Sequence, residues 1–143
     1  MSTRSLVRFA TREEGVSFSE HPERVEVQVY KHYDGYPSGH SVDLAEFLKD
    51  FKIVNGIPFG SDSRTANGID CLAAQYVAAF KMGPGDLYIE NPDTNHSDTE
   101  YTTYVWGDDG KDIWMSIFDT YEDKCIFVGK PQELIDKYEY NDR

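Results

Sequence analysis

The sequence lacks most of the features that mark common enzymes and membrane proteins. It has only two cysteines, Cys71 and Cys125, and no Cys-x-x-Cys pair, so it offers no zinc motif. No run approaches the roughly 18 apolar residues of a membrane-spanning helix. The patterns HExxH, GxGxxG, Walker A and GxSxG are all absent. We therefore assign no catalytic residue, no metal site and no cofactor.

Positive charge is also scarce, because 14 Lys and Arg face 26 Asp and Glu, for a net charge of −12. Such a surface repels phosphate backbones, so we expect no direct nucleic-acid binding and favour a basic protein partner. Solubility, or adaptation to a salty environment, accounts for the same charge. Arg4, Arg8 and Arg12 form the one basic cluster, on one face of a predicted strand. The predicted acidic face consists of Asp108, Asp109, Asp112, Glu122 and Asp123.

The length of 143 residues and the 39% hydrophobic content predict one domain, residues 1–143, with a substantial core. The N-terminal stretch MSTRSLVRFATREE has no apolar h-region, so we expect no secretory signal and no membrane segment. Both cysteines lie in apolar patterns, which indicates free thiols in a reducing compartment. These features favour a cytoplasmic location.

Hydrophobic periodicity predicts an α+β fold. Helices are expected from Ser41 to about Phe51, from Gly68 to Phe80, and from Pro131 onward. The order predicts a mainly antiparallel sheet, two helices inserted after the third strand, and a short C-terminal helix. The strands are expected at Ser5–Phe9, Val16–Phe18, Arg24–Tyr30, Asp86–Glu90, Glu100–Trp106, Asp112–Phe118 and Lys124–Gly129.

The stretch Tyr33–His40 (YDGYPSGH) joins a predicted strand to a predicted helix. Asp34-Gly35 is a turn dipeptide in which glycine readily takes a positive φ, and Gly39 lets the chain enter the helix. The helix dipole favours a neutral imidazole at His40, and Ser41 suits the N-cap. We treat this corner as a structural turn or, alternatively, as a ligand-binding or catalytic site. Its candidate residues are Arg4, His32, Tyr33, Asp34, Tyr36 and His40.

Three weaker sites are also considered. The helix N-termini at Ser41 and Gly68 would form an anion site, with Arg4 or Arg64, if both point to one end of the domain. The loop Asn91–Glu100 has oxygen ligands at alternate positions (Asp93, Asn95 and Ser97), but it lacks the glycine and the twelfth-position glutamate of a calcium loop. An exposed aromatic face, with Tyr104, Trp106 and Trp114, would mediate oligomer formation. The oligomeric state is left open.

Several longer stretches form a recognisable set. They are Thr3-Arg4-Ser5, Tyr33–Leu48 (YDGYPSGHSVDLAEFL), Asn55-Gly56-Ile57 and Asn67–Lys81 (NGIDCLAAQYVAAFK). The set resembles a family of small phage and bacterial proteins that read TRS, Y-D-G-Y-P-x-G-H-G and N-G-x-x-C-L-A-A-Q. Ser41 stands where the family has glycine. The resemblance implies a shared fold and a viral or microbial accessory role. The family has no assigned activity, so no catalytic residue carries over.

Overall fold

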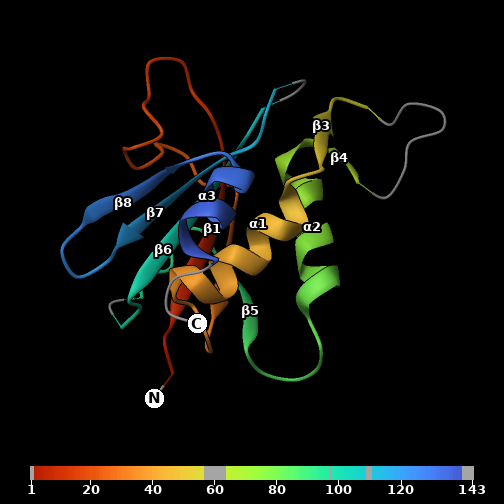
Figure 1. The fold of residues 1–143 in the computed structure, drawn as a ribbon. Helices are drawn as coiled ribbons and strands as arrows, with labels where there is room; N and C mark the ends of the chain where they lie inside the picture. Colours follow the sequence, from red (N-terminus) through yellow and green to blue (C-terminus); the bar gives the residue numbers. More distant parts are fainter. Residues whose placement is uncertain (1, 57–63, 97, 109–110, 140–143) are drawn as a thin grey trace.

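In the computed structural model, six strands form one mixed sheet and three α-helices pack on one of its faces (Figure 1). The structure describes residues 2–56, 64–96, 98–108 and 111–139. The α+β class predicted from the sequence is confirmed. Among the described residues, no helix is both long and apolar enough to cross a membrane.

The sheet has the strand order β5-β2-β1-β6-β7-β8. Four of its five strand pairings are antiparallel, and β1 and β6 at the centre run parallel. Parallel neighbours require a crossover connection, and the helices at residues 42–48 and 68–80 lie in the long segment that joins these two strands. The strand bounds are β1 Ser5–Thr11, β2 Val27–Lys31, β5 Leu87–Glu90, β6 Tyr101–Gly107, β7 Trp114–Asp119 and β8 Lys124–Gly129.

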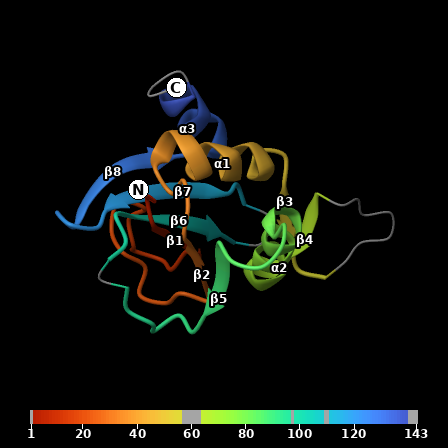
Figure 2. The ribbon, with the colours of Figure 1, turned by 90° about the horizontal axis from the view of Figure 1, so that it is seen from below.

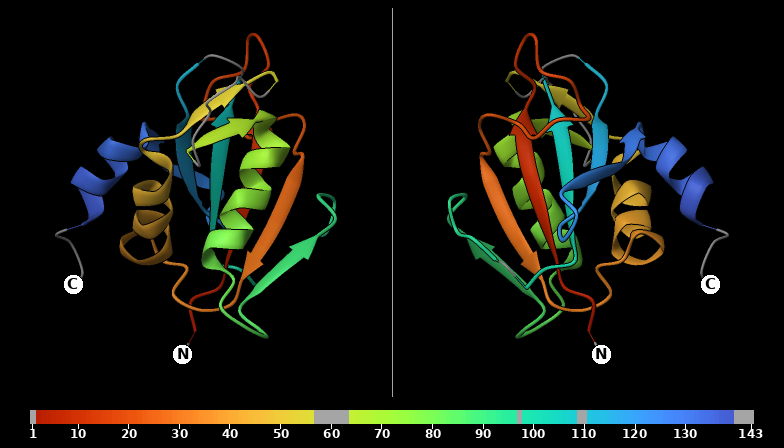
Figure 3. Two further views of the ribbon diagram at one scale, coloured as in Figure 1. Left: turned by 90° about the vertical axis from the view of Figure 1, so that its right-hand side faces the viewer. Right: turned by 90° about the vertical axis from the view of Figure 1, so that its left-hand side faces the viewer.

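The helices begin with a π-helical turn, Pro37–Ser41, that leads directly into α1 (Val42–Leu48). They continue with α2 (Gly68–Phe80) and α3 (Pro131–Tyr138), both close to the predicted bounds. Figure 2 shows α1 and α3 side by side on one face of the sheet, while α2 packs against β1 and β6. The two views in Figure 3 show α2 in front of the strands and then behind them.

Two helices were expected after the third strand, and the structure corrects this detail. Residues Val16–Phe18 form no strand, so α1 and α2 follow the second strand. A short parallel pair, β3 (Lys52–Val54) and β4 (Thr65–Asn67), lies between these helices. The expected hairpin failed because Val16 and Phe18 bury their side chains by packing on the sheet rather than by pairing with it.

The main core lies between the helices and the inner face of the sheet. Alternation along β1 and β2 sends Val7, Phe9 and Val29 inward, where they are almost fully buried. They meet Leu44 from α1 and Leu72 from α2. At about 25 cal/mol per Å² of apolar area, this layer is the main source of stability.

A second, smaller core lies on the opposite face of the sheet, which we call the outer face. Tyr104 and Trp106 of β6 are buried there under the 12–26 loop. Phe18 from this loop stacks on Trp114, with ring centroids 4.8 Å apart and planes 11° apart. The predicted exposed aromatic face is therefore covered by the chain itself.

Candidate functional site

His40 of the Tyr33–His40 corner is buried between α1 and α2, with only 4% of its surface exposed. Its Nε2 lies 2.5 Å from the Tyr76 hydroxyl, and the Phe80 ring packs edge-on against it. Burial lowers the His40 pKa to about 3 and raises the pKa of Tyr76. The imidazole is therefore neutral because of burial rather than the helix dipole, and it forms its hydrogen bond with Tyr76 inside the core.

The backbone of the corner differs from the predicted turn. Asp34, not Gly35, takes the left-handed conformation, with φ of 57°. The glycine is needed for another reason, because a Cβ on Gly35 would lie 2.3 Å from Ser5 Oγ. Gly35 N–H donates to the Thr3 carbonyl at 2.9 Å, and His40 N–H donates to the Asp34 carbonyl at 2.9 Å. The corner is thus packed tightly against the start of β1.

Asp86 ties this corner to the loop before β5. Its carboxylate accepts hydrogen bonds from the buried Lys31 ammonium at 2.5 Å and from the Tyr33 N–H at 3.0 Å. Burial acts to raise the Asp86 pKa, but these two hydrogen bonds and the Lys31 charge together lower it. This ion pair has a structural role that the sequence did not reveal.

The structure does not bring the predicted corner residues into one site. Arg4 is ion-paired with Asp98 at 2.9 Å, and the Tyr30 hydroxyl pairs with His32 Nδ1 at 2.9 Å on the outer face. Tyr33, Asp34 and Tyr36 are exposed, whereas His40 is buried on the helical side. The corner is a folded junction, and its members face different surroundings.

The two helix N-termini do not point to one end of the domain. His40, at the start of the first helical segment, contacts Tyr76 and Phe80 in the last turns of α2. Ser41 is not an N-cap, because it has helical angles and its hydroxyl pairs with Thr103 Oγ1 at 3.2 Å. Arg64 pairs with Asp50 at 3.4 Å. No shared anion site forms at these two termini.

A row of polar side chains crosses the outer face of the sheet, one from each of five neighbouring strands. Strand register places them opposite one another in the order Glu90, Gln28, Arg8, Tyr104 and Ser116. We call these five residues the polar row. Residues 91–96 contact the first three members of the row, and His21, in the loop at residues 12–26, contacts Tyr104. A pocket of about 430 Å³ opens above the middle of the row.

Arg8 occupies the centre of the polar row. Its two terminal nitrogens donate to Tyr104 Oη at 3.0 Å and to the Pro92 carbonyl at 3.0 Å. Tyr104 also meets His21 Nδ1 at 2.7 Å, and His21 Nε2 meets Asp123 at 2.7 Å. Within the described part of the chain, Arg8 forms no ion pair, and its Nε is buried without a partner. The two hydrogen-bond acceptors of its terminal nitrogens are thus an uncharged hydroxyl and an uncharged carbonyl.

Gln28 lies next to Arg8 and is completely buried. Its amide nitrogen donates to Glu90 at 2.9 Å and to the Thr94 carbonyl at 3.0 Å. Those two acceptors fix the amide orientation, so Oε1 is the free end, and it has no partner among the described residues. Glu90 also pairs with His96, whose ring stacks on Tyr30 with centroids 4.6 Å apart. Buried polar atoms normally have partners, which marks this row as unusual.

The pocket above the polar row is lined mainly by side chains that can form hydrogen bonds. Burial raises the pKa of Tyr104, although Arg8 opposes the shift, so the phenol keeps its proton. The lining residues that the structure describes include no cysteine or serine nucleophile. They offer both hydrogen-bond donors and hydrogen-bond acceptors, together with the Arg8 guanidinium, which has no ion-pair partner among the described residues.

Only part of this site was predictable from the sequence. Arg8 was noted with Arg4 and Arg12, and its outward direction follows from strand alternation. The other members are far apart in the chain, and their meeting depends on the parallel pairing of β1 with β6. Gln28 was expected on a half-buried strand, and its complete burial was missed because the loop at 91–99 closes over it.

The structure describes most residues of the calcium-like loop and of the predicted acidic face. Among the described residues, no group of three His, Cys, Asp or Glu is arranged to hold a metal ion, and Ser97 lies outside the described residues. Asp112 pairs with Lys130 at 3.0 Å before β7, whereas Glu122 and Asp123 follow β7 at its other end. The predicted acids are therefore split between two ends of a strand, and Asp109 is not described.

Comparison with known proteins gave no relative. No protein-family model matches the chain, and neither a curated protein nor a solved structure matches it. The arrangement of side chains described above is therefore the basis for any functional assignment.

Proposed function

We propose that this is a binding protein whose polar row holds a small ligand that carries a carboxylate. One observation carries the proposal: the chain has 26 acidic residues, yet Arg8 pairs with none of those that the structure describes. A half-buried guanidinium binds a carboxylate through two parallel hydrogen bonds. The ligand's carboxylate would supply the partner that Arg8 lacks.

Gln28 supports the same proposal and adds a requirement for the ligand. Its Oε1 is buried without a partner, next in register to Arg8. A small shift of the 91–99 loop would let a ligand hydroxyl or amine donate to this oxygen. The pocket volume of about 430 Å³ suits a small metabolite. A polar molecule with one carboxylate and one donor group fits this chemistry.

The experiment compares two arginine variants by amide NMR, with acetate, succinate and glutamate as probes. Arg8→Met removes the charge in the row, and Arg12→Met removes an exposed charge near the end of the same strand. We expect at least one probe to shift signals of residues 91–96 in the wild type and in Arg12→Met, but not in Arg8→Met. Shifts that persist in Arg8→Met, or no shift with any probe at millimolar concentration, would contradict the proposal.

The charge of −12 favours a basic protein as a second candidate partner. Glu122 and Asp123 are exposed together at the β7–β8 turn, where a basic partner would meet them. Binding to a lysine-rich peptide should weaken with salt and should weaken further in Glu122→Gln/Asp123→Asn. Salt-independent binding excludes this candidate.

The wider setting is proposed on sequence grounds. Cys71 and Cys125 are both free, which supports a reducing, cytoplasmic location. The viral or microbial accessory role rests on the three sequence motifs.

A further inference from the structure

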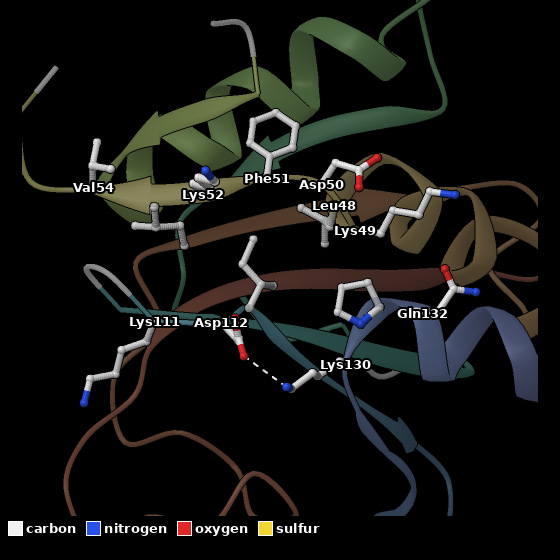
Figure 4. Close-up of a pocket in the computed structure, with 13 residues that line it drawn as sticks. Leu48, Lys49, Asp50, Phe51, Lys52, Val54, Lys111, Asp112, Lys130 and Gln132 are labelled. Atoms are coloured by element: carbon white, nitrogen blue, oxygen red, sulfur yellow. Dashed lines mark ion pairs between the residues drawn. The ribbon is translucent and has the colours of Figure 1, made fainter. Parts of the chain in front are cut away.

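A second pocket, of about 680 Å³, lies between the end of α1, the β6–β7 connection and the start of α3. Three separate chain segments line it, residues 48–54, 111–113 and 130–132. Figure 4 shows the first segment along one wall and Lys111, Asp112 and Lys130 along the opposite wall. We call this pocket the lysine groove.

The lysine groove gathers the positive charge of a strongly acidic chain. Four of the eight lysines line it, against two aspartates, in a chain of net charge −12. Its lysines are Lys49, Lys52, Lys111 and Lys130. A cleft with an excess of one sign concentrates ions of the opposite sign. The groove is therefore a local positive site within a repelling surface.

The ion pairs leave part of this charge uncompensated. Lys130 pairs with Asp112 at 3.0 Å, the one ion pair drawn in Figure 4. The other aspartate, Asp50, pairs with Arg64 outside the groove. Lys52 and Lys111 are exposed and form no ion pair within the described part of the chain. Figure 4 shows Lys52 and Lys111 on opposite walls, with the Lys111 side chain pointing away from the groove, so this exposed side chain must turn inward to contact an anion held there.

The floor of the lysine groove is apolar. Leu48, Ile53 and Ile113 are buried beneath it, and the half-buried Phe51 stands on the same wall as Lys52. An apolar floor with a cationic rim matches a ligand that has an apolar ring and a charged tail. A simple inorganic anion would leave the floor unused.

We propose that the lysine groove binds a small molecule with two or more phosphate charges and an apolar ring, of the class of a nucleoside diphosphate. Lys52 and Lys111 contact the phosphates, and the ring lies on the floor beside Phe51. A long nucleic acid is disfavoured, because its backbone would extend beyond the groove over negatively charged surface.

Calorimetric titration at low salt tests this with ADP, pyrophosphate and adenosine. We expect ADP to bind more tightly than pyrophosphate and adenosine to bind weakest. Lys52→Gln/Lys111→Gln should weaken ADP binding about fivefold to tenfold, because each exposed charge contributes a modest amount. The matched control Lys124→Gln removes an exposed charge on β8, outside the groove, and should leave ADP binding unchanged.

Four results would overturn the proposal. They are no ADP binding at millimolar concentration, equal losses in Lys124→Gln and the groove variants, equal affinity for pyrophosphate and ADP, and tighter binding of a single-stranded oligonucleotide than of ADP. Arg8→Met should leave ADP affinity unchanged, so this site and the polar row are tested separately. All of these substitutions except Arg8→Met are at exposed positions, and thermal unfolding checks that each variant is folded.

Discussion

Tyr76 of α2 and His40 of the corner are joined by a buried hydrogen bond of 2.5 Å. Burial raises the Tyr76 pKa, so the phenol keeps its proton, and its hydroxyl shares a hydrogen bond with Nε2 of the neutral imidazole. The contact connects the start of the first helical segment to the second helix. The Tyr33–His40 motif therefore links the start of the first helical segment to α2 through His40.

This contact predicts a dependence of stability on pH. The His40 pKa is about 3 in the folded protein and about 6.5 when unfolded, so between these values the unfolded state binds the extra proton. The contribution of His40 to the free energy of unfolding is fully present above pH 6.5, and below it this contribution falls by up to about 1.4 kcal/mol per pH unit. In His40→Gln, the free energy of unfolding measured with urea should depend less steeply on pH between pH 4 and 7, because the contribution of His40 is gone. His32→Gln, at a half-exposed position, is the control, and an unchanged slope in His40→Gln would contradict the prediction.

Asp86→Asn should destabilise the fold at neutral pH, because it leaves the buried Lys31 ammonium without its charged partner. We expect a loss of about 2 kcal/mol in urea unfolding at pH 7. The folded-state pKa of Asp86 is lowered, so its contribution is present above the unfolded pKa and is lost as pH falls through the folded value. The difference between Asp86→Asn and wild type should therefore shrink at pH 3.

Asp50→Asn is the matched control for this ion pair, because Asp50 meets Arg64 at 3.4 Å with both side chains more than half exposed. Its effect should stay within about 0.5 kcal/mol. Equal stability of Asp86→Asn and wild type at pH 7 would show that the Lys31 pair is not stabilising.

Substitution at Gly35 should destabilise the fold more than substitution at Asp34. Gly35→Ala forces a Cβ to within 2.3 Å of Ser5 Oγ and 3.0 Å of the Thr3 carbonyl, and should cost about 2 kcal/mol. Asp34→Gly relieves a left-handed residue with φ of 57° and should change stability by less than about 1 kcal/mol. Thermal unfolding measures both, and a larger loss in Asp34→Gly than in Gly35→Ala would contradict this account.

These corner residues show what sequence patterns can predict. The period-2 pattern of β2 and the helical spacing of α2 are local; α2 forms at its predicted bounds, whereas β2 (Val27–Lys31) starts three residues later than the predicted strand Arg24–Tyr30. The strand predicted at Val16–Phe18 failed because its apolar residues pack on Trp106 and Trp114 of β6 and β7, a long-range contact. The turn at Asp34-Gly35 was located, but the roles of its two residues depend on Ser5, far away in the chain.

The candidate sites were harder to predict than the fold. The polar row requires the register of five strands, and the lysine groove requires three segments that are distant in sequence. The four lysines of the groove are scattered along an acidic chain, so the local positive charge of the groove had no signal in the sequence. His40 and Asp34 are close in sequence, which suggested a shared site. In the structure His40 is buried and Asp34 is exposed.

Phe18→Ala should uncover the aromatic residues of the outer face. The Phe18 ring stacks on Trp114 and meets Trp106 edge-on, with centroids 5.3 Å apart. Its removal should cost about 2–3 kcal/mol, since it is only partly buried, and should shift tryptophan fluorescence to longer wavelength. Tyr121→Ala, at a side chain that is 70% exposed, is the control and should change neither quantity.

If the 12–26 loop keeps this face from other molecules, light scattering should detect self-association in Phe18→Ala but not in the control. Unchanged fluorescence in Phe18→Ala would show that the loop does not cover the two tryptophans in solution.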